Sequence, residues 1–93
     1  MHKTGHWLGL DVHDVGAYRL GEFPVQLEPG MVLTVEPGIY VSDRLPVPTG
    51  QPQIDERWHG IGIRIEDDLL VNDGQPEVLT AKACKLMKDL EHC

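Results

Sequence analysis

The regular alternation of apolar with polar or small residues is the feature that most constrains how this chain can fold. In GIGIRIE, residues 60–66, the isoleucines point to one side, while Gly62, Arg64 and Glu66 point to the other. A period of two residues is typical of a β-strand with one buried face. Because residues two apart on a strand lie about 6.5 Å apart on the same side, Arg64 and Glu66 should address one site together.

Other segments predict further strands and one helix. LGLDVH alternates, and MVLTV is β-branched and apolar until Pro37, which cannot donate to a ladder, ends the run after Glu36. Near the C-terminus, apolar residues recur at i, i+3, i+4 and i+7 behind Thr80, a candidate N-cap, and this stripe should pack on a core. Asp67 and Asp68 should turn the chain between two strands. We therefore predict strands at about residues 7–13, 31–41, 60–66 and 69–72, and a helix at about 81–91.

Size, charge and cysteine content exclude several classes of protein. A chain of 93 residues forms one domain at most, with a thin core. The formal net charge of −7, with only eight Lys and Arg residues, argues against a nucleic-acid partner. No transmembrane span or signal peptide can be read, so no membrane partner is expected and a cytoplasmic location is the default. Cys84 and Cys93 form no Cys-x-x-Cys pair and are predicted to be free thiols of a reducing compartment.

Most polar functional groups fall in three segments, HKTGHWLGLDVHD at 2–14, LTVEPGIY at 33–40 and GIGIRIED at 60–67. Each segment carries a His or Glu within an apolar stretch that should be half buried. An ionised carboxylate is costly in such a place, so Glu36 and Glu66 beside several histidines suggest a bound cation. Carboxylates with few imidazoles and no thiolate favour Mn²⁺ or Mg²⁺ over Zn²⁺.

Simpler interpretations of these residues stay open. Glu66 could be satisfied by Arg64 in a purely structural ion pair, and Trp7 beside a sheet is more often a core residue than part of a binding cleft. His2 and His6 have the spacing of a zinc-protease pair, but the Glu of HExxH is absent. One His and two Glu also leave even a single metal ion short of ligands, so part of a metal site would be missing.

Together, HKTGHWLGLDVHDVG, LEPGMVLTVEPGIY and GIGIRIEDDLLV resemble the C-terminal motifs of the proline-specific metallopeptidases, and most closely the bacterial Xaa-Pro aminopeptidases (aminopeptidase P). The resemblance extends from Met1 to about Thr80. It implies an α+β fold of the pita-bread (creatinase/aminopeptidase-like) type, with mostly antiparallel strands and a C-terminal helix. Residues 1–93 would then form the C-terminal portion of a longer catalytic domain, whose two pseudo-symmetric halves hold a dinuclear metal site, commonly manganese.

The resemblance also implies roles for particular residues. His6, Glu36 and Glu66 match three of the five usual metal ligands, and the two aspartates of the first half have no counterpart here. Glu36 would in addition relay a proton. His2 and His13 match histidines that line the substrate cleft. His13 would hydrogen-bond the scissile carbonyl or the developing oxyanion, and His2 would help to hold the peptide.

Two further residues complete the expected catalytic set. Arg64 and Tyr40 match groups that surround the ligands and orient them. Lys3 stands where many relatives have Gly, which affects only the local shape of the loop. The implied cofactors are two divalent metal ions, expected to be Mn²⁺.

The activity implied by the resemblance is that of a metal-dependent aminopeptidase, which releases the N-terminal residue from peptides with proline in second position. The full-length enzyme is expected to be a homo-oligomer. The present chain alone should be inactive, bind Mn²⁺ weakly and self-associate through apolar sheet surface. The alternatives are an Xaa-Pro dipeptidase (prolidase), a creatinase-like or non-catalytic binding member of the same fold, and a free-standing small domain.

Overall fold

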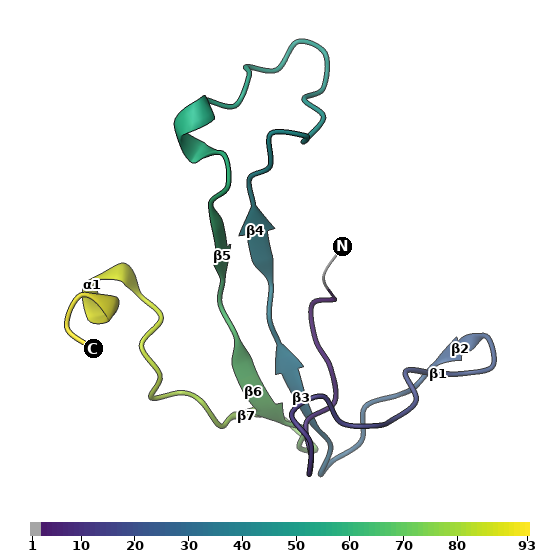
Figure 1. Ribbon diagram of the computed structural model, residues 1–93. Helices are drawn as coiled ribbons and strands as arrows, with labels where there is room; N and C mark the ends of the chain where they lie inside the picture. Colours follow the sequence, from purple (N-terminus) through teal and green to yellow (C-terminus); the bar gives the residue numbers. More distant parts are fainter. Residues whose placement is uncertain (1–2) are drawn as a thin grey trace.

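A long antiparallel ribbon forms the frame of the molecule (Figure 1). The computed structural model describes residues 3–93. At one end of the ribbon β3 (Val32–Val35) pairs with β6 (Asp67–Leu70), and further along β4 (Gly38–Tyr40) pairs with β5 (Gly62–Arg64). The chain runs out along β3 and β4, turns in a loop that contains the 3₁₀ turn η1 (Glu56–Trp58), and returns along β5 and β6.

The two halves of the ribbon share one register, although a short break separates them. Continuing that register across the break sets Glu36 directly opposite Glu66. Pro37 causes the interruption because it has no N–H for the ladder. Its carbonyl still accepts a hydrogen bond from Ile65 N at 3.2 Å, so the two strands stay together through the break.

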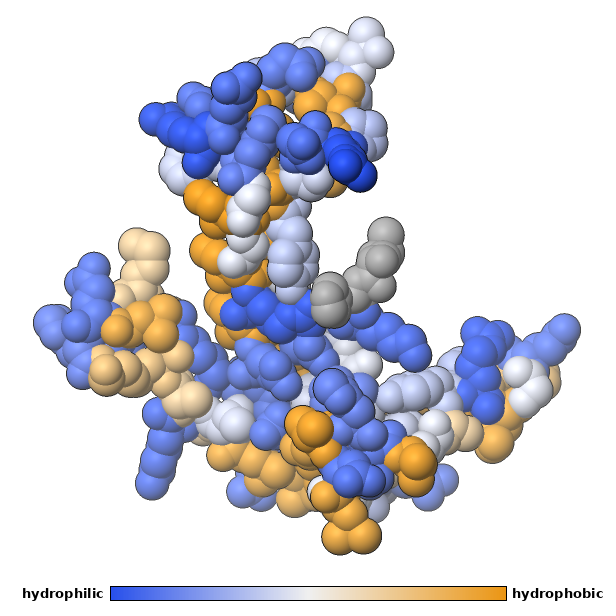
Figure 2. Space-filling model, in the orientation of Figure 1, coloured by the Kyte–Doolittle hydropathy of each residue, from blue (hydrophilic) through white to orange (hydrophobic). Residues whose placement is uncertain are grey.

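The two faces of the ribbon differ in the way that the sequence alternation predicts. One face carries a shallow apolar groove, and Figure 2 shows hydrophobic residues along this part of the molecule. These side chains remain largely open to solvent, since Ile39 is 78% and Ile63 is 65% exposed. The opposite face carries the polar residues of the candidate site. The large apolar side chains of the groove are Ile39, Val41, Ile61, Ile63 and Ile65.

Two further segments widen the β3–β6 end of the ribbon. β7 (Glu77–Val78) pairs with β6 on one side, and residues 4–8 lie along β3 on the other, with a bridge between Trp7 and Leu33. The strand predicted at about 7–13 is therefore much shorter than expected. Residues 9–13 bend away from the sheet instead of continuing along it.

Apolar burial contributes little to this fold. Within residues 3–93 no apolar residue is fully buried, and the buried polar residues are Thr34 and Glu36. The radius of gyration is 17.3 Å, compared with about 12 Å for a compact domain of this length. The hairpin of β1 (Arg19–Leu20) and β2 (Phe23–Pro24) extends away from the sheet (Figure 1). The predicted thin core is thus not formed by the described residues.

The C-terminal segment departs furthest from its prediction. The helix expected at about 81–91 is confined to α1 (Met87–Leu90), and Thr80 does not cap it, because Leu86 occupies the N-cap position. Thr80 bonds to β6 instead. Met87 is 82% exposed, so the apolar stripe does not pack on a core. A short amphipathic helix needs an apolar partner surface, and the described residues do not supply one.

Two other expectations for the second half of the chain are also wrong. Cys84 and Cys93 are joined in a disulfide rather than present as free thiols. Asp67 and Asp68 form no turn, because both lie within β6 and pair with β3. Among the described residues α1 is only four residues long, and no helix has the length and apolar character that a membrane crossing requires.

Candidate metal centre

Thr34, in β3, joins the two segments that carry candidate metal ligands. Its side chain is buried, and its hydroxyl accepts a hydrogen bond from His6 N at 3.0 Å and donates one to Glu36 Oε1 at 3.1 Å. Two backbone bonds reinforce the contact, from Thr34 N to His6 O and from Glu36 N to Thr4 O, both at 2.9 Å. A side chain at Gly5 would collide with Thr34 O, so glycine permits this close approach. β3 therefore fixes His6 beside Glu36.

The ring of His6 is oriented so that one nitrogen faces Glu36. Nδ1 lies 2.9 Å from Trp7 O, and because a carbonyl can only accept, Nδ1 carries the proton of the neutral ring. Nε2 lies 3.2 Å from Glu36 Oε1. In its neutral form the ring presents the lone pair of Nε2 to a carboxylate, an arrangement that a cation bound between the two groups would stabilise.

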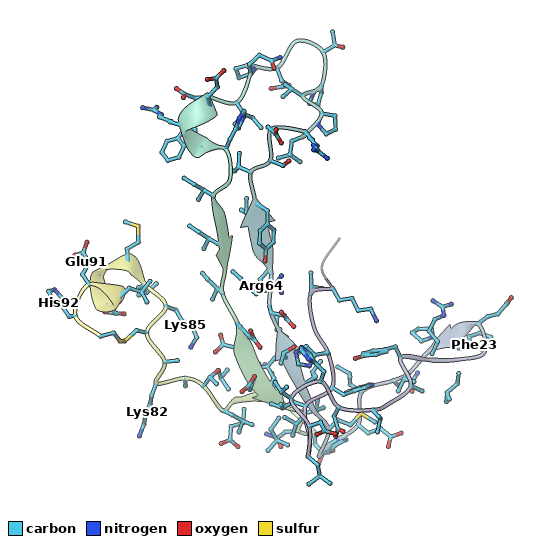
Figure 3. The ribbon with its side chains drawn as sticks, viewed as in Figure 1. Phe23, Arg64, Lys82, Lys85, Glu91 and His92 are labelled. Carbon is cyan, nitrogen blue, oxygen red and sulfur yellow. A yellow bond between two sulfur atoms is a disulfide. The ribbon has the colours of Figure 1, made fainter. Side chains whose placement is uncertain are left out.

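Arg64, on β5, holds the other oxygen of Glu36. Its guanidinium pairs with Glu36 Oε2, donates to Glu36 O at 3.3 Å, and donates to Tyr40 Oη at 2.8 Å. The Tyr40 ring lies against two glycines of the ribbon, where a larger residue would not fit. Figure 3 shows Arg64 projecting from the ribbon on the side of the N-terminal segment. The ion pair of Arg64 is thus with Glu36, and none between Arg64 and Glu66 occurs in residues 3–93.

Glu36 is an ionised carboxylate even though it is only 9% exposed. Burial works to raise its pKa, but the hydrogen bonds from Thr34 and Arg64, the charge of Arg64 and, when its ring is protonated, the charge of His6 together lower the pKa below its ordinary value. The hydrogen bond with Tyr40 raises the pKa of Arg64, against the effect of desolvation, and Glu36 raises it further. The site therefore keeps a negative charge at Glu36 at neutral pH.

Glu66 brings a second carboxylate to the same place. One ligand atom each from His6, Glu36 and Glu66 lies within 4.8 Å of the other two. Glu66 is exposed rather than half buried as expected, whereas the other two are largely covered. Like charges directly opposite each other destabilise a strand pair unless they are compensated. One imidazole nitrogen and two carboxylate oxygens fit a divalent cation, and they leave coordination positions for groups from elsewhere.

His13 lies beside this cluster, and its ring centroid is 4.4 Å from that of His6 with the planes inclined by 63°. A groove of about 500 Å³ opens at this point. Its main lining residues are His6, His13, Glu36 and Arg64, together with Lys3 and Tyr18. Six of the seven residues predicted from the sequence are therefore described, and five of them, with the exception of Tyr40, gather at the groove or the adjoining carboxylate pair. His2 lies outside the described residues.

Sequence reasoning missed Thr34 and Tyr18. Thr34 left a signal, because it stands two residues before Glu36 in a strand and so shares its face. Tyr18 left none, since its place depends on the path of a loop. It stacks on Trp7 with centroids 5.6 Å apart, and Lys3 Nζ lies 4.8 Å from the centroid of its ring. Trp7 is half buried in this stack.

Comparison with known proteins identifies the family of this chain. The sequence profile of metallopeptidase family M24 matches residues 1–73. The chain belongs to this family. Membership of a metallopeptidase family implies divalent metal cofactors, which accords with the donor set described above.

Curated relatives of this M24 chain are Xaa-Pro aminopeptidases. The chain is 50% identical over 92 residues to the enzyme of Haemophilus influenzae, which covers 99% of this chain and 20% of the relative. It is 50% identical over 91 residues to the enzyme of Escherichia coli, covering 98% and 19% respectively. The chain thus spans about a fifth of the length of the curated relatives that it matches.

Solved structures of aminopeptidase P share the fold of this M24 chain. Pseudomonas aeruginosa aminopeptidase PepP matches with a TM-score of 0.78 and 49% identity, over 97% of this chain and 19% of that one. Escherichia coli aminopeptidase P with the inhibitor Pro-Leu matches with a TM-score of 0.77 and 49% identity, over 98% and 19%. The predicted pita-bread fold, with mostly antiparallel strands and a small helix near the C-terminus, is confirmed.

Proposed function

We propose that this chain supplies one side of the active site of an Xaa-Pro aminopeptidase, which releases the N-terminal residue from peptides with proline in second position. The observation that carries the proposal is the convergence of His6, Glu36 and Glu66, whose ligand atoms lie within 4.8 Å of one another. The 50% identity to Xaa-Pro aminopeptidases from two bacteria supports it.

His6, Glu36 and Glu66 are assigned as ligands of a pair of divalent ions, with Mn²⁺ as the proposed metal, because carboxylates with a single imidazole favour the harder ions. Three donors are too few for two ions, so the remaining ligands come from outside residues 3–93. When bound, such ions lower the pKa of a coordinated water and stabilise the oxygen on which negative charge develops.

The protein groups around the ligands have separate roles in the proposed reaction. The carbonyl of Trp7 fixes the His6 tautomer that leaves Nε2 available. Glu36, held by Thr34 and Arg64, accepts the proton of the attacking water and passes it towards the leaving nitrogen.

Substrate contacts are assigned to the groove beside these ligands. His13 donates a hydrogen bond to the scissile carbonyl as charge develops on its oxygen. Tyr40 acts through Arg64, which it holds in place, and His2 is proposed to help hold the peptide. A cytoplasmic location and a homo-oligomeric full-length enzyme remain part of the proposal.

The decisive experiment assays the full-length enzyme that contains this chain on Xaa-Pro dipeptides and on longer Xaa-Pro-Yaa peptides. The longer peptides should be cleaved, with activity lost after treatment with a chelator and restored by Mn²⁺. Activity confined to dipeptides would support the prolidase alternative instead. Glu66→Ala should abolish cleavage, whereas the control Glu77→Ala, at an exposed position on β7, should not.

A further inference from the structure

Among residues 3–93, the loop that presents His13, residues 9–14, is closed by polar contacts. Leu10 is fully exposed and Val12 is 66% exposed, so neither side chain packs against the described residues to hold the loop in place. The ring of His13 nevertheless lies 4.4 Å from the ring of His6. The position of His13 therefore depends on the polar contacts of the loop.

Asp14 supplies these contacts at the closing end of the loop. Its N–H donates to Trp7 O at 3.0 Å, and its Oδ1 accepts from Val15 N at 2.9 Å. The other carboxylate oxygen lies so close to Gly9 that a β-carbon added there would overlap it. Asp14 is half buried, whereas residues 9–13 are all exposed. The Asp14 carboxylate can occupy this position only because residue 9 is a glycine, which has no side chain.

A single carbonyl links this closure to the metal centre. Trp7 O accepts from Asp14 N and also from His6 Nδ1, at 2.9 Å in the second case. The group that orients His6 therefore also anchors the residue that follows His13. Opening of the loop would move His13 relative to His6 without removing any metal ligand.

We propose that Asp14 and Gly9 form a clasp that positions His13 against His6. The clasp consists of the Asp14 carboxylate seated on Gly9 and the Asp14 N–H bonded to Trp7 O. Asp14 is a positioning residue, since it acts through His13. The clasp itself rests on the geometry, and only its effect on catalysis rests on the proposed function.

The test uses the full-length enzyme containing this chain, as wild type and as Asp14→Ala, Asp14→Asn, Gly9→Ala and the double variant Gly9→Ala with Asp14→Ala. Asp11→Ala is the matched control, because the side chain of Asp11 is exposed on the same loop. Crystal structures with Mn²⁺ measure the separation of the His6 and His13 rings. Assays on an Xaa-Pro-Yaa peptide give kcat and KM, and titration gives the affinity for Mn²⁺.

Asp14→Ala should displace His13 and lower kcat by on the order of tenfold to a hundredfold, because a shift of about 1 Å at a reacting centre has such an effect. KM and Mn²⁺ affinity should stay within about twofold of wild type. Asp14→Asn keeps an oxygen for Val15 N and should retain most of the rate. Gly9→Ala should resemble Asp14→Ala. The double variant should be no worse than either, since the nearest remaining atom of residue 14, its Cβ, would be 3.5 Å from the new methyl group.

An unmoved His13 ring in Asp14→Ala overturns the proposal, and so does an additive loss in the double variant. Equal losses in Asp11→Ala, or a fall in activity that follows the melting temperature and is not rescued in Asp14→Asn, would assign Asp14 to general stability instead. If the wild-type enzyme cleaves no Xaa-Pro peptide, the proposed function fails. The crystal structures of the variants then decide the clasp by themselves.

Discussion

Two carboxylates of this chain, Glu36 and Asp67, are held in similar ways and yet have different surroundings. Each accepts a hydrogen bond from a threonine hydroxyl and pairs with a basic side chain, and in each case the partners lower the pKa of the carboxyl group. The partners of Glu36 are Thr34 and Arg64, and those of Asp67 are Thr80 and Lys85.

The difference lies in the electron-pair donors that surround the two carboxylates. Lys85, which lies on the C-terminal segment (Figure 3), pairs with Asp67 at 2.8 Å and also donates to Thr80 O, so the charges of Asp67 and Lys85 cancel within this cluster. Glu36 additionally faces Nε2 of His6 and stands opposite Glu66. A carboxylate whose partners are only a threonine hydroxyl and a basic side chain is therefore a structural anchor. Further electron-pair donors beside it are what make a candidate ligand site.

The largest difference between the two clusters is expected when each carboxylate is replaced by an amide. In the full-length enzyme, Glu36→Gln should lower kcat by more than roughly a hundredfold, since even groups behind metal ligands account for about 10 to 100-fold. Asp67→Asn should leave kcat nearly unchanged and lower the melting temperature. Steady-state kinetics and thermal unfolding measure these changes. Equal losses of activity in the two variants would contradict the assignment of Glu36 to the metal site and of Asp67 to a structural anchor.

The next effect concerns the two threonines. Thr34→Val removes the hydroxyl that pairs with both His6 N and Glu36 Oε1 and should reduce the free energy of unfolding by about 1–3 kcal/mol. It should also weaken Mn²⁺ binding by on the order of tenfold. Thr80→Val, at a half-buried position, should affect stability less and Mn²⁺ binding not at all. Urea unfolding and Mn²⁺ titration provide the comparison, and equal Mn²⁺ affinities in the two variants would contradict it.

A smaller effect should appear in acid. Hydrogen bonds from Lys85 and then Thr80 lower the pKa of Asp67, against desolvation. A lowered carboxyl pKa contributes stability that is fully present above the ordinary aspartate value of about 3.9 and is lost as the pH falls through the lower folded value. The difference in unfolding free energy between wild type and Asp67→Asn should thus stay constant from about pH 7 to 5 and shrink towards about pH 3. A difference that grows in acid would refute this account.

The smallest effect is expected from the disulfide between Cys84 and Cys93. It closes a loop that contains α1, in the C-terminal segment that also supplies the partners of Asp67. Reduction, or replacement of both cysteines by Ser, should speed amide exchange in residues 84–93 only, because the described apolar side chains there are exposed. Activity should not change. Faster exchange in β3 would show that the two regions are coupled.

The site was more predictable than the C-terminal segment, for a physical reason. Strand alternation correctly placed Arg64 and Glu66 on the face opposite the isoleucines, because that pattern follows from backbone geometry alone. The partner of Arg64 could not be predicted, since Glu36 reaches it across the ribbon. The helical spacing of apolar residues near residue 87 predicted a helix longer than α1. Such a pattern requires a surface to pack against, which local sequence does not contain.

By itself the sequence determined which residues share a ribbon face and, through its motifs, the metallopeptidase family. The tertiary structure decided the rest. It set Glu36 opposite Glu66, brought residues 4–8 alongside β3 so that His6 meets both, and closed the loop that carries His13. Contacts within one strand follow from a fixed repeat of the backbone. Contacts between segments depend on register and on buried partners such as Thr34, which only the folded chain brings together.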